Sequence, residues 1–188
     1  GDQYGNYLHL GERDCSIQRR NQKIIEESPS PFIDTKIRDL MAGQAIALAK
    51  SVNYFSAGTV EFIVDKNKDF YFLEMNTRLQ VEHPVTELVT GIDLVEMMIR
   101  IASKEKLNLK QSEISFNGSA IEARVYAEDP ARDFMPSAGR LIKYKSPEQF
   151  SSKSEIIRND TGVFEGSTIS LHYDPMISKL CAWSEIRN

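Results

Sequence analysis

The sequence is poor in the residues that build redox, zinc or membrane-embedded sites. Its two cysteines, Cys15 and Cys181, lack CxxC spacing, so we predict reduced thiols in the protein core. Its three histidines, His9, His83 and His172, are too scattered to suggest a zinc site. No apolar run approaches the ~18 residues of a membrane span, and no signal-peptide pattern opens the chain. These absences predict a soluble intracellular protein.

Positive charge is not in excess either. The 23 lysine and arginine residues are outnumbered by 27 aspartate and glutamate residues, and the net charge of -4 argues against nucleic acid as the main partner. Charged residues at 27% and hydrophobic residues at 41% are ordinary values for a globular protein. A chain of 188 residues can bury roughly 70% of its unfolded surface, so it can form one large or two small domains.

Both ends of the sequence lack an element that would complete a domain. Residues 1–6 are typical of a turn, but no strand precedes them. Residues 179–188 stop just after an apolar, strand-like run. We therefore expect the chain to be a truncated module of a longer protein.

Periodicity divides the chain into two parts and predicts an α+β fold. In residues 1–103 we predict a strand at 7–10, a helix from Asp34 or Thr35 to about Val52, a short helix from Pro84 to Thr90, and a helix capped by Asp93. The apolar stripe of the first helix consists of Ile37, Leu40, Met41, Ala45, Leu48 and Val52. Residues 104–117 are polar and aperiodic, which predicts a linker. Residues 118–188 are predicted to be β-rich, with strands at 120–126, 139–145, 156–158, 169–171 and 179–183.

The stretch from Glu61 to Glu82 concentrates the most coordinated chemistry. Two runs rich in β-branched and aromatic residues, 59–65 and 70–75, flank the polar residues 66–69 and predict a hairpin. An even turn that pairs Asp65 with Phe70 puts Glu61 directly opposite Glu74. Like charges at such a position destabilise the ladder, so they require either water or a compensating cation.

The same face continues along the chain, because alternate residues of an extended segment point to one side. The residues on this face are Glu74, Asn76, Arg78, Gln80 and Glu82. Carboxylate and amide oxygens are the ligands that suit Mg2+ or Mn2+, which leave other positions to water and phosphate oxygens. The series therefore predicts a nucleotide–metal site. The simpler alternative is a hairpin whose outer face is merely charged.

Two other charged segments carry open alternatives. Residues 12–23 (ERDCSIQRRNQK) form a charge cluster, which is either a solvated, self-paired face or a set of basic groups tied to a packed wall and able to stabilise an anion. In the strand at 120–126, Glu122 and Arg124 share one face. That face could line a cleft, or the two side chains could form a surface ion pair.

These motifs together resemble one family, the biotin carboxylase component of biotin-dependent carboxylases, which has an ATP-grasp fold. The matching segments are ERDCSIQRRNQK at 12–23, GTVEF at 58–62, FLEMNTRLQVEHPVTE at 72–87, IEARVYAEDP at 121–130 and YDPMISKL at 173–180. The resemblance implies that residues 1–103 are the C-terminal part of an ATP-grasp domain, an antiparallel sheet with flanking helices. Residues 118–188 would begin the β-rich biotin carboxylase C-terminal domain.

The resemblance also implies a role for each motif residue. Glu61, Glu74 and Asn76 would bind two metal ions that bridge the ATP phosphates. Lys23, Arg78, Gln80 and the Val81 backbone would hold bicarbonate, and Glu82 would remove its proton. Arg124 would face the reacting carboxyphosphate and biotin. The nucleotide contacts would be Ile63, Gln22 and Asn21, although position 21 is His in many members.

The implied reaction is ATP- and bicarbonate-dependent carboxylation of biotin, the first half-reaction of an acyl-CoA carboxylase. No AMKM-type biotinylation motif is present, so biotin would be on a separate carrier domain, and a carboxyltransferase subunit would complete an oligomeric enzyme. The family implies a bacterial cytoplasm or a mitochondrial matrix. The glycine-rich lid is missing, so we expect the chain alone to be inactive. The alternatives are another ATP-grasp carboxylate ligase and a non-catalytic interface module.

Overall fold

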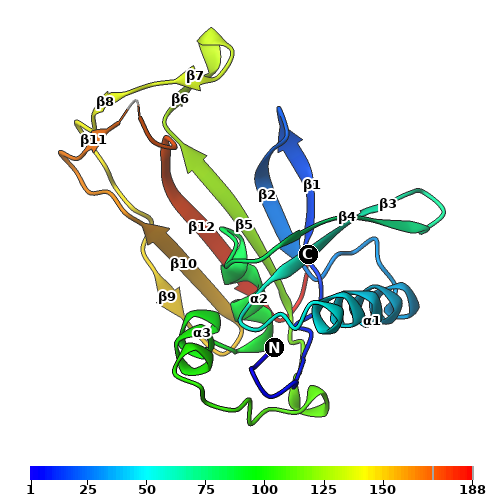
Figure 1. The fold of residues 1–188 in the computed structure, drawn as a ribbon. Helices are drawn as coiled ribbons and strands as arrows, with labels where there is room; N and C mark the ends of the chain where they lie inside the picture. Colours follow the sequence, from blue (N-terminus) through cyan, green and yellow to red (C-terminus); the bar gives the residue numbers. More distant parts are fainter. Residues whose placement is uncertain (171, 188) are drawn as a thin grey trace. The chain divides into compact units, whose positions relative to one another are not determined.

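The computed structural model describes residues 1–170 and 172–187, which form two compact units (Figure 1). The first unit contains Gly1–Asp14 and Ser28–Asn117, and the second contains Cys15–Glu27 and Gly118–Asn188. Residues 28–117 of the first unit therefore lie, in the sequence, between the two parts of the second unit. The charge cluster at 12–23 is divided between the two units as a result.

Three helices lie in the first unit: α1 (Thr35–Ser51), α2 (His83–Thr90) and α3 (Leu94–Ala102). The starts of α1 and α3 and the end of α2 are those that the sequence predicts, and α2 begins at His83, one residue before the predicted Pro84. The Asp34 carboxylate accepts from the backbone N–H of Ile37 at 3.0 Å, and Asp93 does the same for Glu96 at 2.8 Å. Gly91 ends α2 with a left-handed φ of 71°, which glycine adopts without steric cost. The helix predictions are confirmed.

The predicted apolar stripe of α1 is less buried than expected. None of its residues is fully buried, and Leu40 and Val52 are exposed by 50% and 60%. The core of the first unit instead collects around α2 and α3, where Val85, Val89 and Ile101 are almost completely buried. None of the helices in the described part of the chain is both long and apolar enough to cross a bilayer.

The hairpin consists of β3 (Thr59–Val64) and β4 (Phe70–Asn76), and Glu61 lies opposite Glu74, as predicted. The predicted partner of Phe70 is wrong, because Val64 pairs with Phe70 in place of Asp65. A β-bulge at Leu73 accounts for both results, since Glu61 faces Glu74 while Phe62 faces Phe72.

The bulge also changes which hairpin residues share a face. Without it, Phe70 and Phe72 would lie on the side of Glu74, because they are an even number of residues away. With it, they lie with Phe62 on the other side, and the rings of Phe62 and Phe70 pack edge to face with centroids 5.4 Å apart. The carboxylate side of the hairpin is thereby kept clear of these phenylalanines.

The predicted strand at 7–10 is wrong. The segment has no strand partner, and its backbone is bonded by the side chain of Gln111, which accepts from His9 N at 2.9 Å and donates to His9 O at 3.0 Å. Gln111 lies in the short 3-10 helix η1 (Gln111–Glu113). A side-chain amide satisfies the backbone groups that a neighbouring strand would otherwise have bonded. Residues 104–117 are thus held against the N-terminal segment of the first unit.

The second unit is built on a six-stranded sheet in the order β1-β2-β5-β12-β10-β9. These strands are β1 (Asp14–Arg19), β2 (Gln22–Ser28), β5 (Ser119–Tyr126), β12 (Met176–Ser184), β10 (Glu155–Thr161) and β9 (Phe150–Ser151). Two smaller pairs complete the unit: β6 (Glu128–Asp129) with β7 (Met135–Pro136), and β8 (Gly139–Arg140) with β11 (Thr168–Ile169). The 3-10 helix η2 (Pro130–Arg132) joins β6 to β7.

The strands predicted at 120–126, 156–158 and 179–183 are confirmed, and the last two extend further than expected. The strand predicted at 139–145 is wrong beyond Arg140, where the chain is irregular. Of the strand predicted at 169–171, Leu171 lies outside the described residues. The hairpin of β1 and β2 was not predicted. Its two-residue turn has φ of 52° at Arg20 and 62° at Asn21, and an asparagine between apolar runs is the signal that could have found it.

Candidate functional site

The predicted site residues fall in both units. Those in the first unit are Glu61, Ile63, Glu74, Asn76, Arg78, Gln80, Val81 and Glu82, and those in the second are Asn21, Gln22, Lys23 and Arg124. The first set is close in sequence, and the structure joins several of its members by direct hydrogen bonds. The second set comes from β2, the turn before it, and β5.

The paired carboxylates of the hairpin are bridged by an amide. Asn76 Nδ2 donates to Glu61 Oε1 and to Glu74 Oε1, at 3.1 Å in each case. These bonds partly offset the repulsion between like charges that the register places opposite each other. The predicted set of two carboxylates and one amide is therefore assembled at the end of the hairpin.

The bonding continues from Glu61 to a buried glutamine. Gln80 Nε2 donates to Glu61 Oε1 at 2.7 Å, and the Gln80 residue is only 5% exposed. The Gln80 amide oxygen accepts from Arg13, which also donates to the hydroxyls of Thr86 at 2.9 Å and Thr59 at 3.0 Å. Arg13 thus fixes the orientation of the Gln80 amide and, through it, the Glu61 carboxylate. We did not single out Arg13 from the sequence, because its partner is far away along the chain.

Arg78, like Glu74, is an exposed member of the series. Its Nη2 donates to Asn76 Oδ1 at 3.1 Å and its Nη1 to the Leu79 carbonyl at 3.2 Å. The amide of Asn76 is therefore held on both sides, by carboxylates at its nitrogen and by a guanidinium at its oxygen. Glu74 and Arg78 both contact Asn76, although β4 ends at Asn76.

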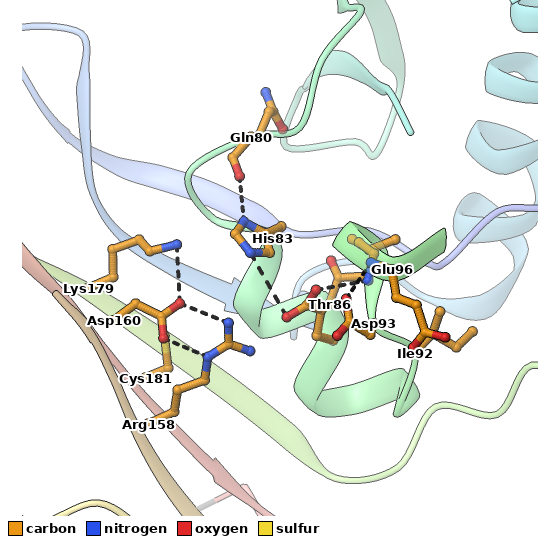
Figure 2. Close-up of polar contacts among 12 residues, drawn as sticks. Gln80, His83, Thr86, Ile92, Asp93, Glu96, Arg158, Asp160, Lys179 and Cys181 are labelled. Carbon is orange, nitrogen blue, oxygen red and sulfur yellow. Dashed lines mark hydrogen bonds and ion pairs between the residues drawn. The ribbon is translucent and has the colours of Figure 1, made fainter. Parts of the chain in front are cut away.

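The alternation does not extend to Glu82. Strand β4 ends at Asn76, and Glu82 lies in the turn that begins α2, with φ of -82° and ψ of 16°. His83 holds this turn, since its Nδ1 donates to the Gln80 carbonyl at 2.9 Å, as Figure 2 shows. Pro84 follows in the first turn of the helix. Glu82 is 2% exposed, so its carboxylate is placed by the turn and the helix start rather than by an extended strand.

The donor set at the hairpin fits a hard divalent cation that keeps other ligands. The described residues contain no group of three or more His, Cys, Asp or Glu side chains able to hold a metal ion. Glu61, Glu74 and Asn76 instead offer two carboxylates and one amide on one face of a hairpin. Mg2+ and Mn2+ are commonly bound through one or two carboxylates, with water and phosphate oxygens at the other positions.

Three charged residues of the cluster at 12–23, Glu12, Arg19 and Arg20, form ion pairs with residues outside it. In the first unit, Arg38 binds the Glu12 carboxylate through Nε at 2.6 Å and Nη2 at 2.8 Å. In the second unit, Arg19 binds Glu128 and stacks 4.0 Å from the ring centroid of Phe134, and Arg20 pairs with Asp133. Interpretation as a self-paired face was therefore wrong for these residues. Of the predicted ligands, Asn21 is exposed in the turn, and Gln22 and Lys23 are half-buried in β2.

Arg124 is paired with a carboxylate that the sequence did not suggest. Its Nε donates to Glu26 Oε1 at 2.6 Å, and its Nη2 lies 2.6 Å from the same oxygen. Glu26 is fully buried, and the Arg124 side chain is 10% exposed. The alternative of a surface ion pair with Glu122 is wrong, because Glu122 is also fully buried and its Oε2 accepts from Cys181 Sγ at 3.4 Å. Cys181 is the buried thiol that was predicted, and Cys15 is half-buried.

Burial gives Glu122 an unusual protonation equilibrium. Desolvation, and then the negative charge of Glu26, raise the pKa of Glu122 from 4.5 to about 7. Its Oε1 has no hydrogen-bond partner among the described residues. A neutral carboxyl group is less costly than a carboxylate in such a place.

We predict that Glu122→Gln in the intact protein removes a pH-dependent loss of stability. Because the folded-state pKa lies above the unfolded one, the wild-type protein loses stability as the pH rises from about 4.5 to about 7. The free energy of unfolding of the variant relative to wild type, followed by thermal melting, should therefore rise by roughly 3 kcal/mol over this range and stay constant above it. Glu155→Gln, on an exposed residue, is the control. A difference that does not change with pH would contradict the prediction.

Two models of known protein families match successive parts of the chain. The family model described as "Carbamoyl-phosphate synthase L chain, ATP binding domain" matches residues 1–110, and the model described as "Biotin carboxylase C-terminal domain" matches residues 122–188. Together they cover most of the described sequence.

Related sequences cover the whole chain. It is 58% identical to the propionyl-CoA carboxylase alpha chain of Ruegeria pomeroyi over 99% of its length, and 56% identical to the mitochondrial methylcrotonoyl-CoA carboxylase subunit alpha of Rattus norvegicus over 100%. The chain spans 30% and 26% of the length of these proteins.

A similar solved structure is the biotin carboxylase domain of a thermophilic 2-oxoglutarate carboxylase bound to bicarbonate, with 48% identity and a TM-score of 0.93. The match covers 99% of this chain and 41% of that one. The corresponding domain dimer from Hydrogenobacter thermophilus, in complex with MgADP, ADP and bicarbonate, gives the same identity and TM-score, with 99% of this chain and 40% of that one covered.

Proposed function

This chain belongs to the biotin carboxylase family, and on that premise we propose that the protein containing it uses ATP and bicarbonate to carboxylate biotin on a carrier domain. The observation that carries the proposal is the hairpin end, where Glu61, Glu74, Asn76 and Gln80 are joined by hydrogen bonds of 2.7 to 3.1 Å. Phosphoryl transfer depends mainly on positioning the phosphates and on neutralising their charge. A metal ion held by this group of oxygens would do both.

Glu61, Glu74 and Asn76 are proposed to hold two divalent cations, Mg2+ or Mn2+. When bound, the cations would neutralise the charge of the ATP phosphates. Bound MgADP in the Hydrogenobacter thermophilus relative supports Mg2+ as the physiological ion. The protein's own contribution is to keep the carboxylates oriented in advance, through the Asn76 bridge and the Gln80–Arg13 contact.

Bicarbonate is proposed to bind to Arg78, Gln80 and the Val81 backbone, with Lys23 of the second unit as a further ligand. Glu82 is the proposed base. Bicarbonate is a poor nucleophile until it loses its proton, so a buried carboxylate beside it would activate it for attack on the γ-phosphate of ATP. The product of that attack is carboxyphosphate, with ADP as the leaving group. Bound bicarbonate in the relatives supports this substrate.

The residues of the second unit are proposed to act on the later step and on the nucleotide. Arg124 would stabilise negative charge on the ureido oxygen of biotin as carboxyphosphate releases CO2. Asn21 and Gln22 are proposed nucleotide contacts. Ile63, in the first unit, is 57% exposed and lies on the face of Glu61, so it can present an apolar surface to an adenine ring.

Propionyl-CoA is the proposed final acceptor of the carboxyl group. The sequence motifs RRNQK at 19–23 and YDPMISKL at 173–180 most resemble those of propionyl-CoA carboxylase α subunits. The 58% identity to such chains supports this choice of acceptor. The acceptor would be bound by a carboxyltransferase subunit in an oligomeric enzyme. The 56% identity to a methylcrotonoyl-CoA carboxylase subunit makes 3-methylcrotonyl-CoA the first competitor to test.

The proposed function is tested by ATP cleavage in the intact protein. We expect ADP release to require Mg2+ and bicarbonate and to increase when free biotin is added. With the carboxyltransferase present, propionyl-CoA should be carboxylated faster than 3-methylcrotonyl-CoA. ATP cleavage driven by an amino acid or another carboxylic acid, and indifferent to bicarbonate, would instead indicate a different ATP-grasp ligase.

A further inference from the structure

The second unit carries a polar stripe on one face of its six-stranded sheet. Glu122 and Arg124 are two residues apart on β5 and point to the same side. Directly opposite them on β12 are Cys181 and Lys179. The stripe continues on β10, where Arg158 pairs with Cys181 and Asp160 with Lys179, and on β2, where Glu26 binds Arg124.

Two cations of the stripe share one carboxylate. Arg158 donates to Asp160 through Nε at 2.9 Å and through Nη2 at 2.8 Å, and Lys179 Nζ lies 3.5 Å from Asp160 Oδ2. Figure 2 shows Asp160 between these two side chains. Asp160 therefore compensates the cations of β10 and β12, and it lies one strand further from β5 than Lys179 does.

Arg124 pairs with a different carboxylate, that of Glu26. Glu26 lies on β2, which borders β5 on the side away from β12. Both Nε and Nη2 of Arg124 lie 2.6 Å from one oxygen of this fully buried residue. A guanidinium is planar, so contacts at two of its nitrogens fix the plane of the whole group as well as its charge. The other nearby carboxyl group, Glu122, has a pKa raised to about 7, because burial and then the negative charge of Glu26 disfavour its ionised form.

We propose that Glu26 is the positioning residue for Arg124, and that its buried carboxylate sets the direction in which the guanidinium points. Glu26 itself touches no substrate in this proposal. The reaction step assigned to Arg124 rests on the proposed function. The placement of Arg124 by Glu26 is argued only from the contacts between β2 and β5. Misplacement of a catalytic group by about 1 Å can cost roughly 100-fold in rate, so an anchor of this kind has a measurable effect.

The test compares Glu26→Gln and Glu26→Asp in the intact enzyme. We expect biotin-dependent turnover to fall by about 10- to 100-fold in Glu26→Gln, with a smaller loss in Glu26→Asp, which keeps the charge but shortens the side chain. Bicarbonate-dependent ATP cleavage without biotin should stay within about twofold of wild type, because Arg124 is assigned to the biotin step. Adding Glu26→Gln to Arg124→Lys should cost little more than Arg124→Lys alone, since both changes act on one group.

Glu27→Gln is the matched control. Glu27 is the next residue of β2, on the opposite face, and it pairs with the exposed Arg187. Its replacement should leave both activities unchanged. If Glu26→Gln does not fold, Glu26→Asp carries the test, with a melting curve to show that the variant is intact.

Crystal structures of the wild type and the variants separate this proposal from the proposed function. If Arg124 keeps the same rotamer and order without the Glu26 carboxylate, the proposal is overturned, whatever the reaction. Normal biotin-dependent turnover in a folded Glu26→Gln enzyme overturns it as well. If Arg124 moves in the variants but the wild type shows no bicarbonate-dependent ATP cleavage, the proposed function is wrong and the role of Glu26 in placing Arg124 stands.

Discussion

Glu82→Gln in the intact protein is expected to lower bicarbonate-dependent ATP cleavage by about 100- to 10,000-fold, the usual effect of a general base. Glutamine has nearly the same size and shape as glutamate, so the turn before α2 should keep its geometry, while the group proposed to take the proton is lost. Glu82 as a whole residue is 2% exposed, and water therefore has poor access to replace its carboxylate. The measurement is ADP release with MgATP, with and without bicarbonate.

Glu96→Gln serves as the control for Glu82→Gln. Glu96 lies on α3 and pairs with Arg100 at 2.6 Å, and both side chains are 54% exposed. Its loss should change neither activity nor melting temperature by much. Near-normal turnover of a folded Glu82→Gln variant would remove Glu82 from the role of base, and bicarbonate would then need another proton acceptor.

Glu61→Gln is expected to have the second largest effect, and to separate activity from stability. Removing one of the two paired carboxylates should raise the Mg2+ concentration required and lower turnover by about 100-fold, equivalent to roughly 3 kcal/mol of lost charge stabilisation. In the absence of metal, the same change removes a like-charge pair from directly opposite positions, so stability should stay the same or rise by up to about 1 kcal/mol.

The Glu61→Gln experiment measures ATP cleavage over a range of Mg2+ concentrations, together with thermal melting in the presence of a chelator. Asp69→Asn, an exposed change in the turn of the same hairpin, is the control and should affect neither measurement. A variant that melts several degrees lower in the chelator would mean that Glu61 is a structural residue of the hairpin. Unchanged Mg2+ dependence would exclude it as a ligand.

The hairpin shows how far sequence reasoning reaches. Alternation and turn length placed Glu61 opposite Glu74, and the structure agrees. The same reasoning assumed a regular ladder, so it paired Asp65 with Phe70 and missed the bulge at Leu73. A bulge depends on how both strands twist and pack, and no residue type at Leu73 marks it in the sequence.

Local pattern also grouped Asn76, Arg78 and Gln80 with the paired carboxylates. Asn76 contacts Glu74 and Arg78, each two residues away, and Gln80 contacts Glu61, 19 residues away. The same reasoning wrongly extended this face to Glu82, because His83 and Pro84 begin a helix and turn the chain. Local pattern could not predict partners that are far apart in the sequence. Arg13 meets Gln80 from 67 residues away, and Glu26 meets Arg124 from 98 residues away. Such pairs form only when separate strands and loops are brought together by the fold.

The bulge at Leu73 has a consequence for how this hairpin can vary among related proteins. The pairs from Thr59–Asn76 to Glu61–Glu74 lie on one side of it, and the pairs from Phe62–Phe72 to the turn lie on the other. A strand that already accommodates one extra residue can absorb another change in length at the same place. The tip of the hairpin is therefore free to gain or lose residues during evolution, or in design, without disturbing the register of the two carboxylates.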